Sequence, residues 1–388
     1  MGTTRREFLK ASALAVGAAA RVPAAAGTPL PVCKLKSIER IDYRYPFGKG
    51  MRERAVLRLT TTDGLVAGVQ CGGKAGLAPL RKAVADMNLC DHAAVWKAIT
   101  TADVGDGWFR AAFDILCWDA HARAVNKPLH ALLGTKRRRY RPYGDERWNV
   151  RLSPDEYARR VAGTFARQGI LCTKLHVPGT YALSSDRKGD NGVKGLPLKT
   201  VLTMLRKVRE AVGDKVSLAY DPHPQKAAAL KLADARTIAK VLDELRYEWV
   251  ECLLPPEPDR MKEWLVLRKE AKLRFQREES PGQTAEEEIR WLEAGAVNQV
   301  TWDCRFGGIT KFLEILAWAR SHPGKGVVFN LHYSQPAHQQ LAAALTDAEQ
   351  PWVEAVRPKD RYRDGWTTIP QWTGVEGIDW AFVEKHKV

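Results

Sequence analysis

The sequence is short of several features that would quickly place it in a class. It has seven cysteines among 388 residues, an odd and sparse set that excludes a small scaffold stapled by disulfides. The apolar stretch near its start is about ten residues long, too short to span a bilayer core of roughly 30 Å. No Gly-x-Gly-x-x-Gly motif opens a helix after a strand, so a dinucleotide-binding fold has no support. No repeat with a period of about 20–50 residues is present.

What the composition does contain is material for a large folded core. Hydrophobic residues make up 45% and charged residues 27%, which excludes a disordered chain and a collagen-like fibre. The length suggests two or three domains. Lysine and arginine number 61 against 45 acidic residues, a net charge of +16. Such an excess suits nucleic acid, an anionic surface or acidic small molecules as partners, and composition alone does not choose among them.

The start of the chain carries the pair Arg5-Arg6, then Phe8-Leu9, and then an apolar run over residues 11–20. Three alanines at 24–26 offer a cleavage site of the A-x-A type. These features resemble a twin-arginine export signal over residues 1–26, a route that carries proteins already folded. We therefore expect a periplasmic or otherwise exported protein that is not held in a membrane after cleavage. Cleavage would remove four basic residues and one acidic residue and leave a charge of +13, so the signal does not explain the basicity.

Residues 34–139 and 140–356 differ in pattern. The first region begins with alternating strands to about residue 72, with a turn at Thr62-Asp63-Gly64, and continues with helical patterns at 77–98 and 108–125. We interpret it as an α+β capping domain, to which a C-terminal segment, 357–388, returns. In the second region short apolar strands alternate with amphipathic helices. Strands are expected near 141–152, 170–177, 216–221, 249–254, 273–279, 298–303, 326–332 and 352–356, and helices near 154–168, 197–212, 233–246, 258–271, 284–294, 309–321 and 335–347.

Eight strands alternating with helices favour a (β/α)8-type barrel over an open doubly wound sheet. The chemistry of such a barrel lies at the C-terminal ends of its strands. Ionisable residues close most of the expected strands here, which a purely structural barrel does not need, because a buried charge costs several kcal/mol unless it is paired. These residues are Lys174, His176, Asp221, His223, Glu251, Glu278, Glu279, Asp303, His332 and Glu354.

Three of these carboxylates, Asp221, Glu251 and Glu279, close neighbouring strands and can converge on one hard divalent cation. Mg2+ prefers a few carboxylate oxygens and keeps other positions for water or substrate. Zinc is less suitable, since no cysteine or histidine cluster has the required spacing. Asp303 and His332 close consecutive strands, so the carboxylate can hold one imidazole nitrogen and make the other a proton acceptor near neutral pH.

At this point the chain resembles the enolase superfamily, and within it the mandelate racemase-like subgroup, over about residues 34–385. The most specific segment is Asp303-Cys-Arg-Phe-Gly-Gly-Ile-Thr310, and residues 112–134 look like the helix that precedes the barrel. The resemblance implies that Asp221, Glu251 and Glu279 bind Mg2+ and that Asp303 and His332 form a catalytic dyad. It further implies that Lys174 and Glu354 contact the substrate carboxylate. Glu279 is preferred to Glu278 because Ser280 follows it, as in the family's Gly-Glu-Ser-like segment.

The chain departs from the family pattern in three places. His176 stands where the second lysine of the family's Lys-x-Lys is expected, so the usual lysine base is missing. The interval from Asp221 to Glu251 is a few residues longer than usual. Glu251 is followed by Cys252-Leu253-Leu254, where the family has Glu-Pro. These departures concern the base on the second strand and the geometry of the fourth strand.

Superfamily chemistry is abstraction of the proton α to a carboxylate, with Mg2+ stabilising an enediolate. His223 resembles the acid of some sugar-acid dehydratases, so we favour dehydration of an aldonate-type acid to a 2-keto-3-deoxy acid, with His332 as base. Racemisation or epimerisation that uses His332 and His176 is the alternative, and a sugar-acid-binding barrel without turnover is a third.

The capping region is expected to select the substrate. Its loops at 45–50 and 71–76 carry Lys49 and Lys74, which suit an anionic ligand, and Trp108 and Trp148 are further candidates. The basic cluster at 136–139, with Tyr140 and Tyr143, could contact nucleic acid, but we interpret it as a linker. We expect a small carboxylate as substrate, no nucleic acid partner, and a homo-oligomer.

Overall fold

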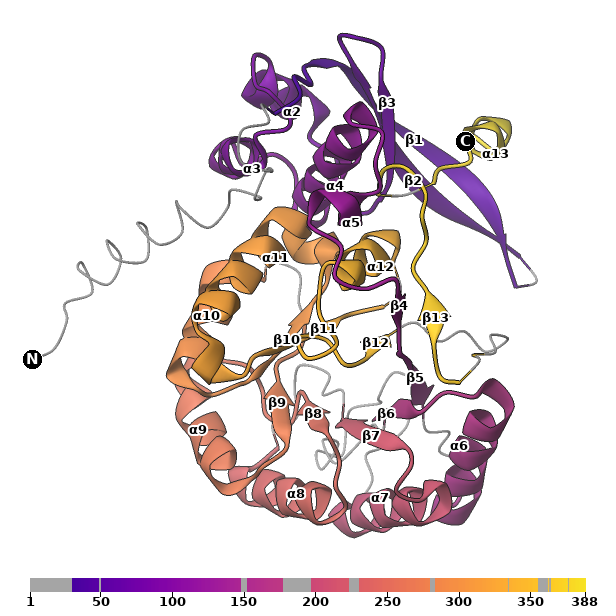
Figure 1. Ribbon diagram of the computed structural model, residues 1–388, viewed down its shortest axis with the longest axis vertical. Helices are drawn as coiled ribbons and strands as arrows, with labels where there is room; N and C mark the ends of the chain where they lie inside the picture. The colour runs from indigo at the N-terminus through magenta and orange to yellow at the C-terminus, as the bar shows by residue number, and fades with distance from the viewer. Residues whose placement is uncertain are drawn as a thin grey trace, which may run out of the picture.

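The computed structural model describes residues 30–48, 50–147, 152–176, 197–222, 230–279, 283–333, 335–354, 362, 364–375 and 377–388. Within them an α+β unit lies above a ring of strands and helices (Figure 1). The predicted fold class, a (β/α)8-type barrel with an N-terminal capping domain, is confirmed. No helix in these ranges is long and apolar enough to cross a membrane.

The capping domain is built on an antiparallel sheet of β1 (Leu35–Phe47), β2 (Gly50–Thr61) and β3 (Val66–Cys71), in that order. Gly64 takes a φ of 88° in the turn between β2 and β3, a conformation that glycine adopts without strain. Helix α4 (Gly107–Ala124) is buried on nearly every side, between this sheet and the barrel. Three further helices complete the domain: α2 (Leu77–Val84), α3 (His92–Thr101) and α5 (Leu129–Leu132).

The single helix predicted over 77–98 is wrong, because α2 and α3 are separate. Asp91 begins a new helix by accepting a hydrogen bond from the backbone N–H of Ala94. The apolar spacing of the two short helices mimics one long amphipathic helix, and the capping aspartate is the signal that distinguishes them.

Parallel strands form the barrel, and each lies close to a predicted position. Six of them pair in the order β12-β5-β6-β7-β8-β9, and β10 pairs with β11. The ring continues where the Asn298 N–H donates to the Phe275 carbonyl at 3.2 Å and the Phe329 N–H to the Glu349 carbonyl at 2.7 Å. The strands are β5 (Pro142–Arg147), β6 (Cys172–His176), β7 (Ser217–Asp221), β8 (Trp249–Glu251), β9 (Arg274–Gln276), β10 (Gln299–Trp302), β11 (Val328–Leu331) and β12 (Val353–Glu354).

Amphipathic helices surround these strands and bury their apolar faces against them (Figure 1). Helix α6 illustrates the local signals: Ser153 and Glu156 form a capping box at its start, and Gly169 ends it in the left-handed conformation. The helices are α6 (Pro154–Gln168), α7 (Leu198–Val212), α8 (Leu232–Glu244), α9 (Met261–Glu270), α10 (Ala285–Ala294), α11 (Cys304–Ser321) and α12 (Pro336–Ala343).

Asp114 of α4 joins the capping domain to the barrel. Its buried carboxylate accepts hydrogen bonds from the backbone N–H groups of Ile309 at 2.6 Å and Thr310 at 3.0 Å. Gly308 interrupts α11 with a φ of 74°, and a Cβ on it would lie 2.7 Å from Asp114 Oδ2. The Gly-Gly-Ile-Thr segment is therefore a docking site for the capping domain, and the predicted helix over 309–321 is the part of α11 that follows the kink at Gly308.

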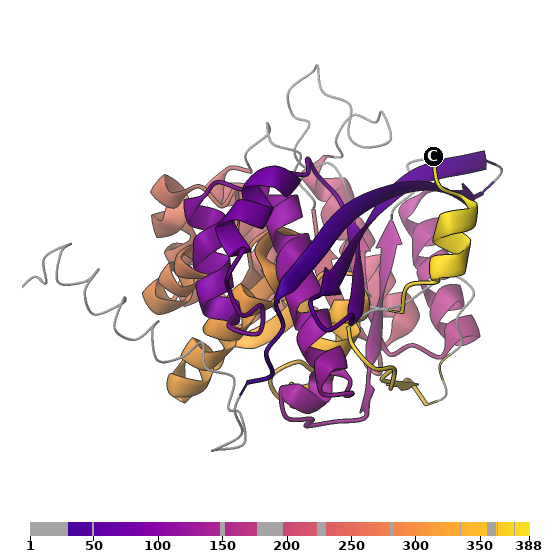
Figure 2. The same ribbon diagram turned by 90° about the horizontal axis from the view of Figure 1, so that it is seen from above.

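The C-terminal segment crosses back to the capping sheet. Strand β13 (Thr367–Thr368) pairs with β4 (Arg139–Tyr140), and α13 (Trp380–Lys385) lies beside β1 and β2 (Figure 2). The last residues hydrogen-bond to β1, from the Arg44 N–H to the His386 carbonyl and from the Val388 N–H to the Asp42 carbonyl, both at 2.9 Å.

Candidate active site

Lys174, on β6, lies among carboxylates from neighbouring strands. Its ammonium nitrogen is 2.8 Å from Glu251 Oε2, 3.4 Å from Asp221 Oδ2 and 3.8 Å from Glu354 Oε2. All four side chains are buried inside the C-terminal end of the barrel. The strand period of two brings them together, because alternate residues of each strand face the barrel axis.

Burial and charge act in opposite directions on these groups. Burial alone would lower the pKa of Lys174, but the negative charges of Glu251 and Glu354 outweigh it and raise that pKa well above the usual value. Burial raises the pKa of Glu251, and Lys174 only partly offsets the rise. For Glu354, by contrast, burial is outweighed by the charges of Lys174 and the neighbouring histidines together with the Tyr143 hydrogen bond, and its pKa is lowered. The ammonium group therefore stays charged and stabilises an ionised Glu354.

His332 contacts two carboxylates through its two ring nitrogens. Nδ1 lies 3.0 Å from Asp303 Oδ2, as expected for consecutive strands, and Nε2 lies 3.1 Å from Glu279 Oε1. Burial alone would raise the pKa of Asp303, but hydrogen bonds from His332 and Arg305 lower it well below the usual value. Burial, followed by the charge of Glu251, raises the pKa of Glu279 well above its usual value. Asp303 therefore remains ionised, and Glu279 lies against the opposite ring nitrogen of His332.

Backbone strain occurs next to two of these side chains. Cys252, which follows Glu251, has a φ of 54°, and Tyr333, which follows His332, has a φ of 60°. Left-handed backbone at residues other than glycine costs about 1–3 kcal/mol and tends to occur where function fixes a side chain. The segment Cys252-Leu253-Leu254, which stands where the expected family pattern has Glu-Pro, thus begins with a strained turn.

His176 is also held by acids. Its Nε2 lies 2.9 Å from Asp221 Oδ2 and 3.0 Å from Asp145 Oδ1. Burial would lower the pKa of His176, but the charge and hydrogen bond of Asp221 raise it above the usual value. The imidazole that replaces the family's lysine therefore holds a proton between two carboxylates.

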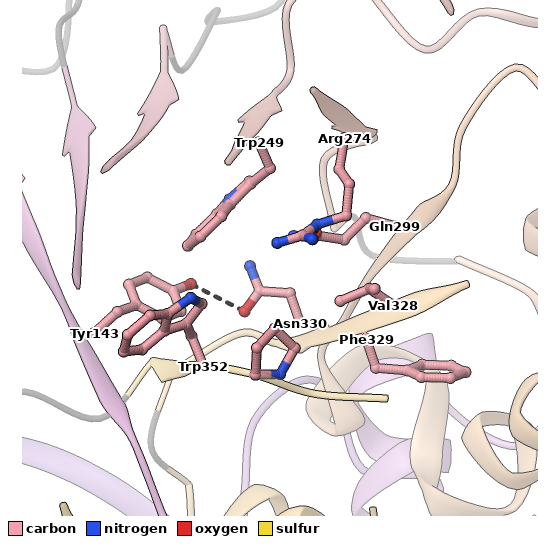
Figure 3. A pocket seen from close by; sticks show the side chains of 9 residues that line it. Tyr143, Trp249, Arg274, Gln299, Val328, Phe329, Asn330 and Trp352 are labelled. Carbon is pink, nitrogen blue, oxygen red and sulfur yellow. Dashed lines mark hydrogen bonds between the residues drawn. The ribbon is translucent and has the colours of Figure 1, made fainter. Parts of the chain in front are cut away.

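Several site residues escaped the sequence analysis. The buried Tyr143 hydroxyl lies 3.0 Å from Asn330 Oδ1 (Figure 3). It also lies 2.8 Å from Glu354 Oε2. Tyr143 and Asn330 line a cavity of about 10 Å³ inside the barrel, beneath the charged cluster. Arg305 donates to both oxygens of Asp303, its Nε at 3.0 Å from each. Alternation along β5 and β11 was the available signal for Tyr143 and Asn330, but Arg305 follows its strand and had none.

The remaining predicted residues lie elsewhere. Lys74 is exposed, and in the described part of the chain no contact joins it to the charged cluster; its backbone N–H donates to Asp106 at 2.8 Å. Trp108 stacks edge-on against Phe306, with ring centroids 4.4 Å apart, close to Arg305. Lys49, Trp148 and His223 fall outside the described residues.

The basic cluster at 136–139 does not form an aromatic nucleic-acid surface. Tyr140 and Tyr143 are buried, so neither can stack on a base. Arg137 is inserted between α12 and the following segment, where it donates to the Ala342 carbonyl at 2.7 Å and pairs with Asp347 at 2.9 Å. Its role in this structure is to join the linker to the barrel.

The donor set at the strand ends suits Mg2+. Its carboxylate oxygens are hard ligands, and buried acids outnumber the permanent cations Lys174 and Arg305. Burial raises the pKa values of Glu251 and Glu279, and a cation bound between them would oppose that rise. Within the described residues, no three acidic, histidine or cysteine side chains already adopt a metal-binding arrangement. Instead, the Lys174 ammonium lies against Asp221 and Glu251, so a cation there would displace it.

A family profile described as Enolase C-terminal domain-like matches residues 156–375, more than half of the chain. The protein therefore belongs to the enolase superfamily, and its likeness is to the mandelate racemase and muconate lactonizing enzyme branch. No protein of curated function matches the sequence.

Solved structures share the architecture across nearly the whole chain. D-glucarate dehydratase from Agrobacterium tumefaciens, complexed with magnesium, has a TM-score of 0.75 at 20% identity, covering 92% of this chain and 100% of that one. L-talarate dehydratase from Polaromonas sp. JS666, complexed with Mg and L-glucarate, has a TM-score of 0.71 at 20% identity and coverages of 92% and 97%. The 3,6-anhydro-D-galactonate cycloisomerase from Zobellia galactanivorans has a TM-score of 0.69 at 18% identity and coverages of 92% and 99%. At these identities the likeness establishes the fold alone.

The Lys174 cluster predicts a specific loss of stability. Replacing Lys174 with Met leaves buried carboxylates without their cation, and we expect the free energy of unfolding to fall by about 3 kcal/mol in urea without divalent ions. Mg2+ should then raise the melting temperature of the variant more than that of the wild type, because both cations neutralise the same acids. The control Lys311→Met removes a lysine that pairs with Glu314 on α11 and should cost about 1 kcal/mol with no response to Mg2+. A Lys174→Met variant as stable as wild type without Mg2+ would contradict this account.

Proposed function

We propose that the protein is a Mg2+-dependent lyase that dehydrates an aldonate-type sugar acid to a 2-keto-3-deoxy acid. The observation that carries this proposal is the Asp303–His332 pair, which lies beside a buried cation and its carboxylates at the C-terminal end of the barrel. A dyad of this kind can remove a proton α to a carboxylate, and the neighbouring positive charge can stabilise the negative charge that results.

His332 is the base in this proposal. Asp303, held ionised by Arg305, accepts the Nδ1–H and fixes the tautomer in which Nε2 carries the lone pair. Nε2 then faces the site, where Glu279 currently contacts it at 3.1 Å. Proton abstraction requires Glu279 to move off this nitrogen, as it would on joining Asp221 and Glu251 as a metal ligand.

Lys174 and Glu354 would hold the substrate carboxylate. The Lys174 ammonium can pair with one carboxylate oxygen, while Glu354, positioned by the Tyr143 hydroxyl, would lie beside the substrate carboxylate. Bound Mg2+, held by Asp221, Glu251 and Glu279, would supply Lewis-acid stabilisation of the developing charge. The β-hydroxyl then leaves as water with a proton from an acid, for which His223 is our candidate, and the resulting enol becomes the 2-keto acid.

His176 favours dehydration over the racemase alternative. A racemase needs a second base with a free lone pair facing the α-carbon, whereas Asp145, which is not a proposed metal ligand, contacts His176 Nε2 at 3.0 Å, and neighbouring carboxylates raise the pKa of His176. A barrel that only binds sugar acids would not need the imidazole of His332 to be held by Asp303. Enolization followed by loss of water therefore accounts for more of the site than either alternative.

The base assignment predicts the behaviour of one histidine variant. With Mg2+ and a panel of aldonates and aldarates, we expect wild-type protein to form a 2-keto acid from at least one substrate. His332→Asn keeps a polar side chain but removes the base, so turnover should fall by about 1,000-fold. His322→Gln, which changes an exposed histidine at the end of α11, should leave turnover unchanged.

The same assay separates the alternatives. Deuterium exchange at the α-carbon without a change of skeleton would support racemisation. Binding without exchange or keto acid would support the non-catalytic barrel. Full turnover by His332→Asn would contradict the assignment of the base.

We also propose that the protein works outside the cytoplasm, on the strength of the Arg5-Arg6 segment, which lies outside the described residues. Replacing both arginines with lysine should keep the unprocessed chain in the cytoplasm of a bacterial host that has the twin-arginine route. Cell fractionation with immunoblotting measures this, and the variant in which Lys10 becomes Arg is the matched control. Normal export of the double-lysine variant would contradict the proposal.

A further inference from the structure

Two cysteines of the capping domain lie side by side and have no part in the proposed reaction. Cys33 immediately precedes β1, and Cys90 lies in the loop between α2 and α3; both are buried, with 1% and 2% exposure. The Leu89 N–H donates to the Cys33 carbonyl at 2.8 Å. These two segments are far apart in sequence, so the fold itself brings the two cysteines together.

Asn88 fixes the two cysteine backbones relative to one another. Its Oδ1 accepts from the Cys33 N–H at 3.0 Å and from the Cys90 N–H at 3.1 Å. Its Nδ2 donates to the Pro31 carbonyl at 3.0 Å, which holds the segment on the other side of Cys33. One amide side chain thus clamps both strands of backbone that a cross-link would join.

The two thiols are close enough to interact directly. This interaction lowers the pKa of Cys33 and raises the pKa of Cys90. Cys33 is therefore the better nucleophile of the pair, because the thiolate is the reactive form. The two groups have the unequal acidities that an attacking and a resolving thiol need.

A metal site is not the explanation of this pair. Cys117 of α4 lies close enough for its charge to affect both thiols, yet the described residues contain no group of three cysteine, histidine or acidic side chains arranged to hold a metal ion. Burial raises the pKa of Cys117 well above its usual value, which makes it a poor nucleophile. Cys33 and Cys90 are left as the reactive pair.

We propose that Cys33 and Cys90 form a disulfide bond when the folded protein meets a disulfide oxidant. The Cys33 thiolate attacks one sulfur of the oxidant and releases its first thiol. The Cys90 thiol then gives its proton to solvent and attacks the Cys33 sulfur, which releases the second oxidant thiol. Two electrons pass from the protein to the oxidant, and the other five cysteines stay reduced.

An oxidant would reach the two buried cysteines from the side of the segment that precedes Cys33. Leu30 and Val32 are 44% and 67% exposed, so the segment that leads into Cys33 lies at the surface, where the Asn88 clamp and the Leu89–Cys33 backbone hydrogen bond hold it. Local release of this segment exposes Cys33 without disturbing the sheet. The bond would close a loop of roughly 60 residues that contains the whole capping sheet, and it suits a protein that folds with reduced thiols before export.

The test uses the full chain and oxidised glutathione as the oxidant. After oxidation, denaturation and alkylation, intact mass should show two of the seven thiols protected, and peptide mapping should link Cys33 to Cys90. The melting temperature should rise by about 5 °C and return on reduction. Cys33→Ser and Cys90→Ser should abolish both effects, whereas Cys71→Ser, a buried cysteine of β3, should keep them.

Seven alkylated thiols, a Cys33–Cys117 link, or a stable glutathione adduct on Cys33 alone would each overturn the proposal. None of these readouts depends on turnover, so failure of the proposed reaction leaves this test intact. Equally, an enzyme that turns over normally with all thiols free would disprove only the disulfide.

Discussion

The buried charge at the C-terminal end of the barrel is the constraint on which the rest of the structure depends. Lys174 is surrounded by acids that would each be costly to bury alone. The barrel interior beneath them is polar for the same reason. Tyr143 connects Glu354 to Asn330, and the amides of Gln276 and Gln299 continue this hydrogen-bonded chain to Arg274 at the opposite end of the strands. A barrel filled with aliphatic side chains would offer these buried charged groups no hydrogen-bonding partners.

Much of this architecture follows from the sequence because it depends on local patterns. Alternation of apolar residues locates the strands, and parallel strands necessarily place Asp303 beside His332, since β10 and β11 pair in register from Gln299–Val328 to Trp302–Leu331. The sequence does not reveal the contacts that depend on where side chains point beyond the ends of the strands. Arg305 turns back onto Asp303, and Asp145 holds His176, because the barrel brings residues together that share no sequence pattern.

The role of one characteristic sequence motif is structural rather than catalytic. The Gly-Gly-Ile-Thr segment was the most specific sign of the superfamily, yet its backbone receives Asp114 and joins the capping domain to the barrel. The catalytic assignment therefore depends on separate residues at the strand ends. His176 and Cys252 stand where the sequence differs from the pattern expected of the family, one held by two acids and the other in a strained turn.

The central claim is that these carboxylates are arranged for a divalent cation, which the Lys174 ammonium partly replaces. A crystal soaked with Mn2+ as a surrogate for Mg2+ and measured by anomalous diffraction tests it directly. We predict one strong peak coordinated by Asp221, Glu251 and Glu279, with the Lys174 ammonium moved away from its 2.8 Å contact with Glu251. An empty difference map at millimolar Mn2+, with Lys174 still paired to Glu251 and Asp221, would contradict the account.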